Sequence, residues 1–353
     1  MASPRNTFQY SPILADDNPK AHIATLRAFT LLTGLCADVA MLMPETLLPI
    51  RNIICDPFYQ ASRTCLKLFD DYDVEHPNSS SIAIRLMHSA VLHKCGRTGP
   101  SWHCLGQAIL LSNELTLHRE SSHARSSDPI EVQLLRYTFW TLHVSNRSAA
   151  ILNNRPILLR EALFDPLPNI PFFGADHISL LDTTLAHNAP PFEYRLLVSA
   201  DLLRRLWSAA ADLIVGVKEL AHRRQQQLNH GDLTPTDLMR SYVSFAGILD
   251  DLPPWVQSPD SAVMAGEHLD AVAAAYQRGA FWRQKVDVVV TFHCLRMVLL
   301  QRCAEYGLVA VMGLSDEPIM LAMRTAEIAR DCLDTVDTIP LEYLQVNGEP
   351  LVS

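Results

Sequence analysis

Apolar side chains recur along most of the chain at the three- and four-residue spacing that places them on one face of an α-helix. The spacing is clearest over residues 129–152, where Pro129 suits the first turn of a helix. One face of this segment carries five apolar side chains, at Val132, Leu135, Phe139, Leu142 and Ala149. Asn146 lies on the same face, so we expect it to be buried and to have a hydrogen-bond partner.

The same spacing predicts nearly all the other elements. It indicates helices over 21–43, 57–71, 82–94, 101–117, 193–228, 235–250, 268–305 and 317–337, and a short helix over 178–186. A β-branched run over 286–292 could form a strand, but its apolar positions keep the helical period, so we predict helix there. Prolines gather at about 165–192, where we expect a long irregular crossover. We therefore predict an all-α fold of about ten helices with no sheet, with a polar tail over 1–20 and one large domain over 21–350.

Composition and charge exclude several classes of protein. With 48% hydrophobic and 19% charged residues, the chain is too apolar to be intrinsically disordered. A formal net charge of −9 argues against nucleic-acid binding through the chain's own field, because phosphate binding depends on clustered Lys and Arg. The most apolar segment, 28–43, contains Asp38 and is shorter than the ~20 residues of a spanning helix, and the N-terminus lacks a secretory pattern. We expect no membrane segment, and a location in the nucleus or the cytoplasm.

The cysteines and histidines show no catalytic or metal-binding pattern. The eight cysteines are scattered with no CxxC pair, which argues against a metal cluster or a disulfide framework and favours reduced, buried thiols. His103 precedes Cys104 and His293 precedes Cys294, and we interpret each pair as a packed cysteine beside a surface histidine. A catalytic Cys–His pair across the fold is the alternative.

One acidic run, Asp70-Asp71-Tyr72-Asp73, is similar to the aspartate-rich metal sites of helical terpene synthases. No second motif of this kind follows it in the chain, and a proline loop comes directly after it. We therefore interpret these residues as solvated acids at the end of a helix.

The stretch 102–171 carries an ordered set of residues that goes beyond composition. It contains WHCLGQAILLSNELTLHRE over 102–120, LLRYTFWTLHVSNRSAAILNNRP over 134–156 and LFDPLPNIP over 163–171. The matching positions are Leu115, Leu117, His118, Arg119, Arg136, Trp140, Asn146, Arg147, Arg155, Pro156, Asp165 and Pro168. In order and spacing they resemble the middle homology region of fungal binuclear zinc-cluster transcription factors, and the resemblance extends over about 21–350.

The resemblance implies an all-α regulatory domain whose signature residues are architectural rather than catalytic. Arg147 and Arg155 would hold the proline-bearing loop through its carboxylates and carbonyls, with Asp165 as a partner for one of them. Three positions depart from the family pattern. Thr116 and Asn154 stand where the family favours Gly, and Asn146 stands where it favours Asp.

The family also carries a basic head with six zinc-binding cysteines, which this sequence lacks, so the resemblance implies no zinc cofactor and no sequence-specific DNA binding by this chain alone. It implies a nuclear transcription regulator, not an enzyme, that controls a metabolic or secondary-metabolite gene set. Its partners would be other regulators or a second copy, with a small-molecule effector. The alternatives are a helical scaffold reused as a biosynthetic enzyme or small-molecule-binding protein, and a decayed fragment. The missing head and the short C-terminus would be natural or the product of a partial gene model.

Overall fold

The computed structural model of the chain describes residues 19–123, 126–159, 180–181, 192–226, 233–262 and 271–346. Within these ranges the chain forms thirteen α-helices and one short 3₁₀ helix, with no strand. The prediction of an all-α fold is therefore confirmed. The short helix expected over 178–186, most of the crossover at 165–192 and nearly all of the tail over 1–20 lie outside the described residues.

The chain divides into two compact units, each described by itself. The first comprises residues 1–142 and 162–169, and the second comprises 143–161 and 170–353. The boundary falls inside one helix, α6 (Pro129–Asn153). The expectation of one domain over 21–350 stays a prediction.

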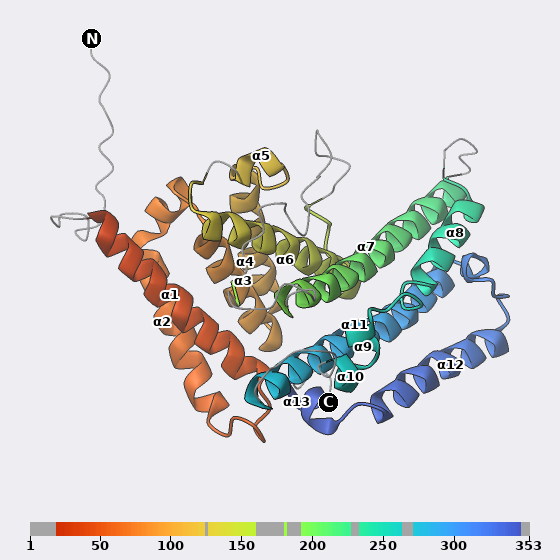
Figure 1. Cartoon of the computed structure of the whole chain (residues 1–353). Coiled ribbons are helices and arrows are strands. Elements are labelled where there is room, and N and C mark those ends of the chain that lie inside the picture. Colours follow the sequence, from red (N-terminus) through yellow and green to blue (C-terminus); the bar gives the residue numbers. More distant parts are fainter. Residues whose placement is uncertain are drawn as a thin grey trace, which may run out of the picture. The chain divides into compact units, whose positions relative to one another are not determined.

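The first unit is built from the N-terminal helices, shown in red to yellow in Figure 1. They are α1 (Pro19–Leu42), α2 (Arg51–Glu75), α3 (Ser79–Lys94), α4 (Thr98–Glu114), α5 (Glu120–His123) and the first part of α6. Helix α1 packs along α2 and α3, and α3 packs along α4. Small side chains let α1 approach its neighbours closely, since Ala37 and Ala40 are both fully buried.

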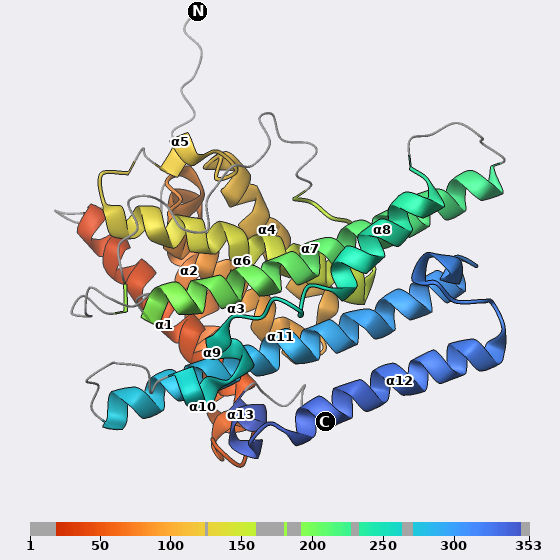
Figure 2. The same ribbon diagram turned by 45° about the vertical axis from the view of Figure 1, so that its right-hand side comes forward.

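The second unit contains the two longest helices, which lie side by side in Figure 1 and Figure 2. Its helices are α7 (Phe192–Gln225), α8 (Pro235–Ala246), α9 (Pro254–Gln257), α10 (Pro259–Ala262), α11 (Ala271–Glu305), α12 (Pro318–Asp337) and α13 (Leu341–Val346), with the 3₁₀ helix η3 (Val309–Met312) after α11. One apolar core joins α7, α8, α11, η3 and α12, and includes Leu206, Phe245 and Leu295, all nearly inaccessible to solvent. The β-branched run over 286–292 lies within α11, as its period predicts.

Helix boundaries follow the sequence with one substantial difference. Helix α2 begins at Arg51, before Pro57, where we expected it to start. The earlier turn forms because its side chains have tertiary partners: Arg51 donates to the carbonyl oxygen of Met43 at 2.8 Å, and the Cys55 thiol contacts the carbonyl oxygen of Ala37 at 3.5 Å. Packing therefore outweighs the preference of proline for a first helical turn.

Candidate functional site

The first signature segment is the C-terminus of α4, which closes in a Schellman motif centred on Thr116. The N–H of Leu117 donates to the carbonyl oxygen of Ser112 at 3.0 Å, and the N–H of Thr116 donates to that of Asn113 at 2.9 Å. This geometry requires a left-handed residue, and Thr116 has φ of 52°. Leu117, which follows it, is buried at 1% exposure and anchors the turn in the core.

Three other helix ends within the described ranges close with the same pair of backbone hydrogen bonds, and each has glycine at the left-handed position, namely Gly96, Gly307 and Gly313. Among the described residues, the end of α4 is thus the one such helix end where a β-branched residue, Thr116, occupies the left-handed position. Left-handed backbone is costly for a residue with a Cβ atom, and most costly for a β-branched one. Thr116 therefore replaces the glycine of the signature pattern at a position where the left-handed backbone favours glycine.

Substitution at this position is expected to separate backbone strain from side-chain contacts. The variant Thr116→Gly should be about 1 kcal/mol more stable than Thr116→Ala, because both lose the 2.6 Å hydroxyl contact with Ser122 and only alanine keeps a Cβ at positive φ. Denaturant unfolding measures the difference. Asn113, exposed within α4, is the matched control, since its alanine variant should be more stable than its glycine variant by about 1 kcal/mol. The same order at both positions would contradict the left-handed assignment.

The second signature segment is α6 with the loop that follows it. Asn146 is fully buried, and its Oδ1 accepts hydrogen bonds from the backbone N–H groups of Leu158 at 2.8 Å and Leu159 at 2.9 Å. Arg147 donates from Nη1 to the carbonyl oxygen of Leu159 at 3.5 Å. The prediction that Asn146 is buried with a partner is confirmed. Asn146 and its neighbour Arg147 together bind the N–H groups and a carbonyl oxygen of the segment Leu158–Leu159.

The Nδ2 group of Asn146 is buried and has no hydrogen-bond partner among the described residues. An unsatisfied buried donor costs about 1–3 kcal/mol. A carboxylate at this position would place an oxygen there instead of the donor. The asparagine therefore supplies the acceptor oxygen that an aspartate would supply at this position, without its negative charge.

The loop itself continues from α6 through Asn154, which has φ of 52° and whose Oδ1 accepts a hydrogen bond from Nζ of Lys218 at 2.9 Å. Arg155 and Pro156 come next and line a cavity against α7. Asp165 and Pro168 lie outside the described residues, so the expected pairing of Asp165 with an arginine stays a prediction.

The remaining signature residues lie in the first unit. Trp140 is buried and packs edge-on against Phe139, with ring centroids 5.1 Å apart. His118 is half-buried, and burial together with Arg119 lowers the pKa of its imidazole. Arg119 is exposed. The structure therefore divides the signature set: His118, Arg119 and Trp140 belong to one unit, whereas Asn146, Arg147, Arg155 and Pro156 gather at one loop in the other.

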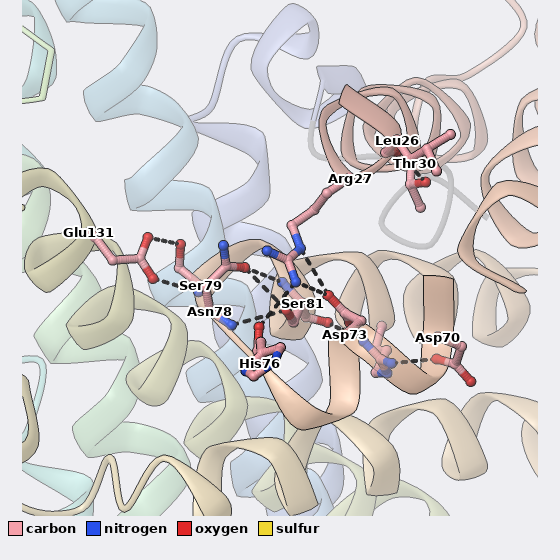
Figure 3. A network of polar contacts seen from close by, with 11 residues as sticks. Leu26, Arg27, Thr30, Asp70, Asp73, His76, Asn78, Ser79, Ser81 and Glu131 are labelled. Atoms are coloured by element: carbon pink, nitrogen blue, oxygen red, sulfur yellow. Dashed lines mark hydrogen bonds and ion pairs between the residues drawn. The ribbon is translucent and has the colours of Figure 1, made fainter. Parts of the chain in front are cut away.

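The acidic run at the end of α2 forms a buried ion-pair network, drawn in Figure 3. Asp73 is fully buried, and its Oδ1 accepts hydrogen bonds from Nε and Nη2 of Arg27, at 2.9 and 2.6 Å, and from the Ser81 hydroxyl at 2.8 Å. Its Oδ2 accepts from Nη1 of Arg85 at 2.6 Å, and Arg85 also pairs with Asp70 at 2.7 Å. The interpretation of these acids as solvated is wrong for Asp73. Its two oxygens accept hydrogen bonds from two arginines and a serine, so the carboxylate is bound within the protein.

A second polar contact of this network fixes the start of α3. Asn78 caps the helix by accepting from the backbone N–H of Ser81 at 3.1 Å, and Glu131 on α6 accepts from the backbone and hydroxyl of Ser79 at 2.8 and 2.6 Å. A carboxylate near a helix N-terminus is favourable because it meets unpaired N–H groups. These groups therefore build structure in the first unit.

A Ser–His pair also lies in the first unit, where Ser62 and His88 are both buried and their Oγ and Nε2 atoms are 2.8 Å apart. The Ser62 hydroxyl donates its hydrogen to the carbonyl oxygen of Thr30 at 2.8 Å. His88 must then donate from Nε2 to the serine oxygen. A histidine that donates to a serine is not a base toward it, so the pair lacks the geometry of a nucleophile with its base.

Burial makes His88 a source of pH dependence, because desolvation is the main cause that lowers its pKa from 6.5 to about 4. The unfolded chain then binds a proton that the folded chain does not, so stability is complete above pH 6.5 and falls toward pH 4. Between pH 7 and pH 5 this histidine alone should lower the free energy of unfolding by about 2 kcal/mol. Denaturant unfolding at both pH values measures this difference in the free energy of unfolding. The difference should be smaller in His88→Gln than in the unsubstituted chain, but unchanged in His93→Gln, an exposed position of the same helix. Equal losses in both variants would contradict the assignment.

The thiols only partly match the prediction of buried cysteines. Cys55, Cys65 and Cys303 are buried, whereas Cys95 and Cys294 are exposed. Around residue 293 the expected orientation is wrong, since His293 is buried and Cys294 faces solvent, because the core stripe of α11 passes through Phe292 and Leu295 and includes His293. Around residue 103 it is confirmed, with His103 exposed and Cys104 half-buried.

Two further observations concern ligands and membranes. Within the described ranges, no three His, Cys, Asp or Glu side chains gather closely enough to hold a metal ion. Helix α1 over Ala21–Leu42 is long and apolar enough to cross a membrane, which the length argument from the sequence did not anticipate. A core helix satisfies the same criterion, and α1 packs on α2 and α3. Comparisons of the chain with protein-family models, curated proteins and solved structures find no match.

Proposed function

We propose that this chain is the regulatory part of a transcription regulator of the fungal zinc-cluster type. One observation carries the proposal. Thr116 and Asn154 are the two positions where the signature pattern favours glycine and this sequence departs from it, and they are also the two non-glycine residues with positive φ among the described residues. A glycine pattern in sequence and a positive φ in the backbone are separate observations, so their agreement at both positions supports the resemblance.

The arrangement at α6 adds support of a different kind. Asn146 and Arg147 act on backbone groups of the following loop and not on an open cleft. Signature residues that fix a loop are expected in a regulatory scaffold, whereas a catalytic site would direct them at substrate. The Ser62–His88 pair, with its hydrogen bond directed the wrong way for catalysis, does not favour the alternative of a biosynthetic enzyme.

In this proposal the chain acts in the nucleus through other regulators or a second copy of itself, responds to a small molecule, and controls a set of metabolic or secondary-metabolite genes. The proposal includes no sequence-specific DNA binding by this chain alone, and the net charge of −9 supports that part of it.

Two experiments test the proposal together. The full chain, fused to an unrelated DNA-binding domain, should change expression of a reporter relative to that domain alone. Deletion of the gene should change transcript levels of a defined gene set. A silent fusion, with unchanged transcripts and a stalled metabolite in the deletion strain, would favour the enzyme alternative and overturn the proposal. Tight, sequence-selective retardation of DNA by the purified chain would overturn the absence of DNA binding.

A further inference from the structure

The second unit contains a cavity of about 280 Å³ at the loop that Asn146 holds. The end of α6 contributes Ala150 and Ile151, the loop contributes Arg155, Pro156 and Ile157, and α7 contributes Ala211, Ile214, Val215 and Lys218. The four α7 positions follow the spacing of one helix face, so this face of α7 forms the floor of the cavity. Ile151, Ala211 and Ile214 are buried at 5% exposure or less, which makes that floor apolar.

Two cationic side chains line the cavity. Arg155 and Lys218 are its charged lining residues, and no Asp or Glu lines it among the described residues. Lys218 donates from Nζ to Oδ1 of Asn154 at 2.9 Å, a neutral acceptor that orients the ammonium group without neutralising it. An apolar floor with the Lys218 ammonium group beside it complements a molecule that has an apolar body and one anionic end.

We propose that this cavity binds a small apolar monocarboxylate, with the hydrocarbon part against α6 and α7 and the carboxylate at Lys218. The volume corresponds to about nine water molecules at ~30 Å³ each, which suits a ligand of about ten non-hydrogen atoms. A bound ligand touches α6, the loop and α7 at once, so it stabilises the loop on α7. The inference rests on the regulatory function proposed above, since the ligand would be the regulator's effector.

The test uses octanoate as the probe, titrated into the purified full chain by calorimetry. We expect a dissociation constant on the order of 0.1 mM. Octan-1-ol and octylamine have the same eight-carbon alkyl group as octanoate but lack its negative charge, and they should bind at least about tenfold more weakly. Lys218→Gln should weaken octanoate binding about tenfold, and Ala150→Leu should weaken it by filling the cavity. Arg224→Gln is the matched control, because Arg224 is an exposed cation of the same helix outside the cavity.

Each result bears on the proposal. Octanoate binding that weakens in Lys218→Gln and Ala150→Leu but not in Arg224→Gln supports it. Equal affinity for octanol, equal loss in Arg224→Gln, or no binding at millimolar octanoate overturns it. The reporter fusion separates the two proposals. If octanoate binds as expected but the fusion is silent, the cavity assignment stands and the regulatory function fails. If the fusion changes reporter expression but octanoate does not bind, the regulatory function stands and the cavity assignment fails.

Discussion

Replacement of Asp73 by alanine is expected to lower the free energy of unfolding by about 4 kcal/mol, one of the two largest losses we expect from a single substitution. The Asp73 carboxylate is fully buried and accepts four hydrogen bonds, from Arg27, Ser81 and Arg85. These donors come from α1 and α3, while Asp73 belongs to α2. Its removal leaves Arg85, whose side chain is 3% exposed, with only the half-exposed Asp70 as a charge partner. Denaturant unfolding measures the loss.

Asp71 is the matched control for this experiment, because it lies on the same helix and is exposed. Asp71→Ala should change stability by less than about 0.5 kcal/mol. A double-mutant cycle with Arg85→Met gives a sharper test, since the uncompensated charge disappears when both partners are apolar. The double variant should therefore be more stable than the sum of the single losses implies, by about 2 kcal/mol. Additive losses, or equal losses in Asp71→Ala and Asp73→Ala, would show that Asp73 does not act through these arginines.

The network also shows where the sequence could not predict the structure. Helical periods are local, so they predicted the long helices, including α11 through its β-branched run. The partner of Asp73 on α1 lies 46 residues away along the chain, and no local pattern indicates that pairing. The sequence therefore indicated only solvated acids at a helix end. The arginines that bind Asp73 come from α1 and α3, which pack against α2.

More of the loop after α6 could be predicted from the sequence than of the Asp73 network, because of the position of Asn146. A polar residue on an otherwise apolar helix face must be buried, and a buried amide needs partners, so its position alone implied a structural hydrogen bond. Which groups it binds depends on the path of the chain after α6, and that path depends on the left-handed turn at Asn154. Asparagine tolerates such a turn but does not require it, so the sequence indicated the turn only through its departure from a glycine pattern.

Replacement of Asn146 by alanine should cost about 3 kcal/mol, because the loss of an acceptor for two backbone donors is only partly offset by removal of the buried Nδ2 group. Oδ1 accepts the N–H groups of Leu158 and Leu159, and Leu159 is itself fully buried. Alanine leaves both donors without their acceptor, at about 1–3 kcal/mol each. Hydrogen exchange of the two amides reports the effect directly, since their exchange should accelerate about 100-fold or more.

Two variants make this test specific to the loop. Asn153→Ala, at the exposed end of the same helix, should leave both the exchange of the two amides and the stability nearly unchanged. Asn146→Asp keeps an acceptor for both N–H groups and removes the unpartnered Nδ2 donor, so it should keep the two amides protected where alanine exposes them. Because the loop carries Ile157 into the wall of the cavity, Asn146→Ala should also weaken octanoate binding, whereas Asn146→Asp should preserve it. Protected amides in Asn146→Ala would mean that other contacts hold the loop, and the link from α6 through the loop to the cavity would then fail.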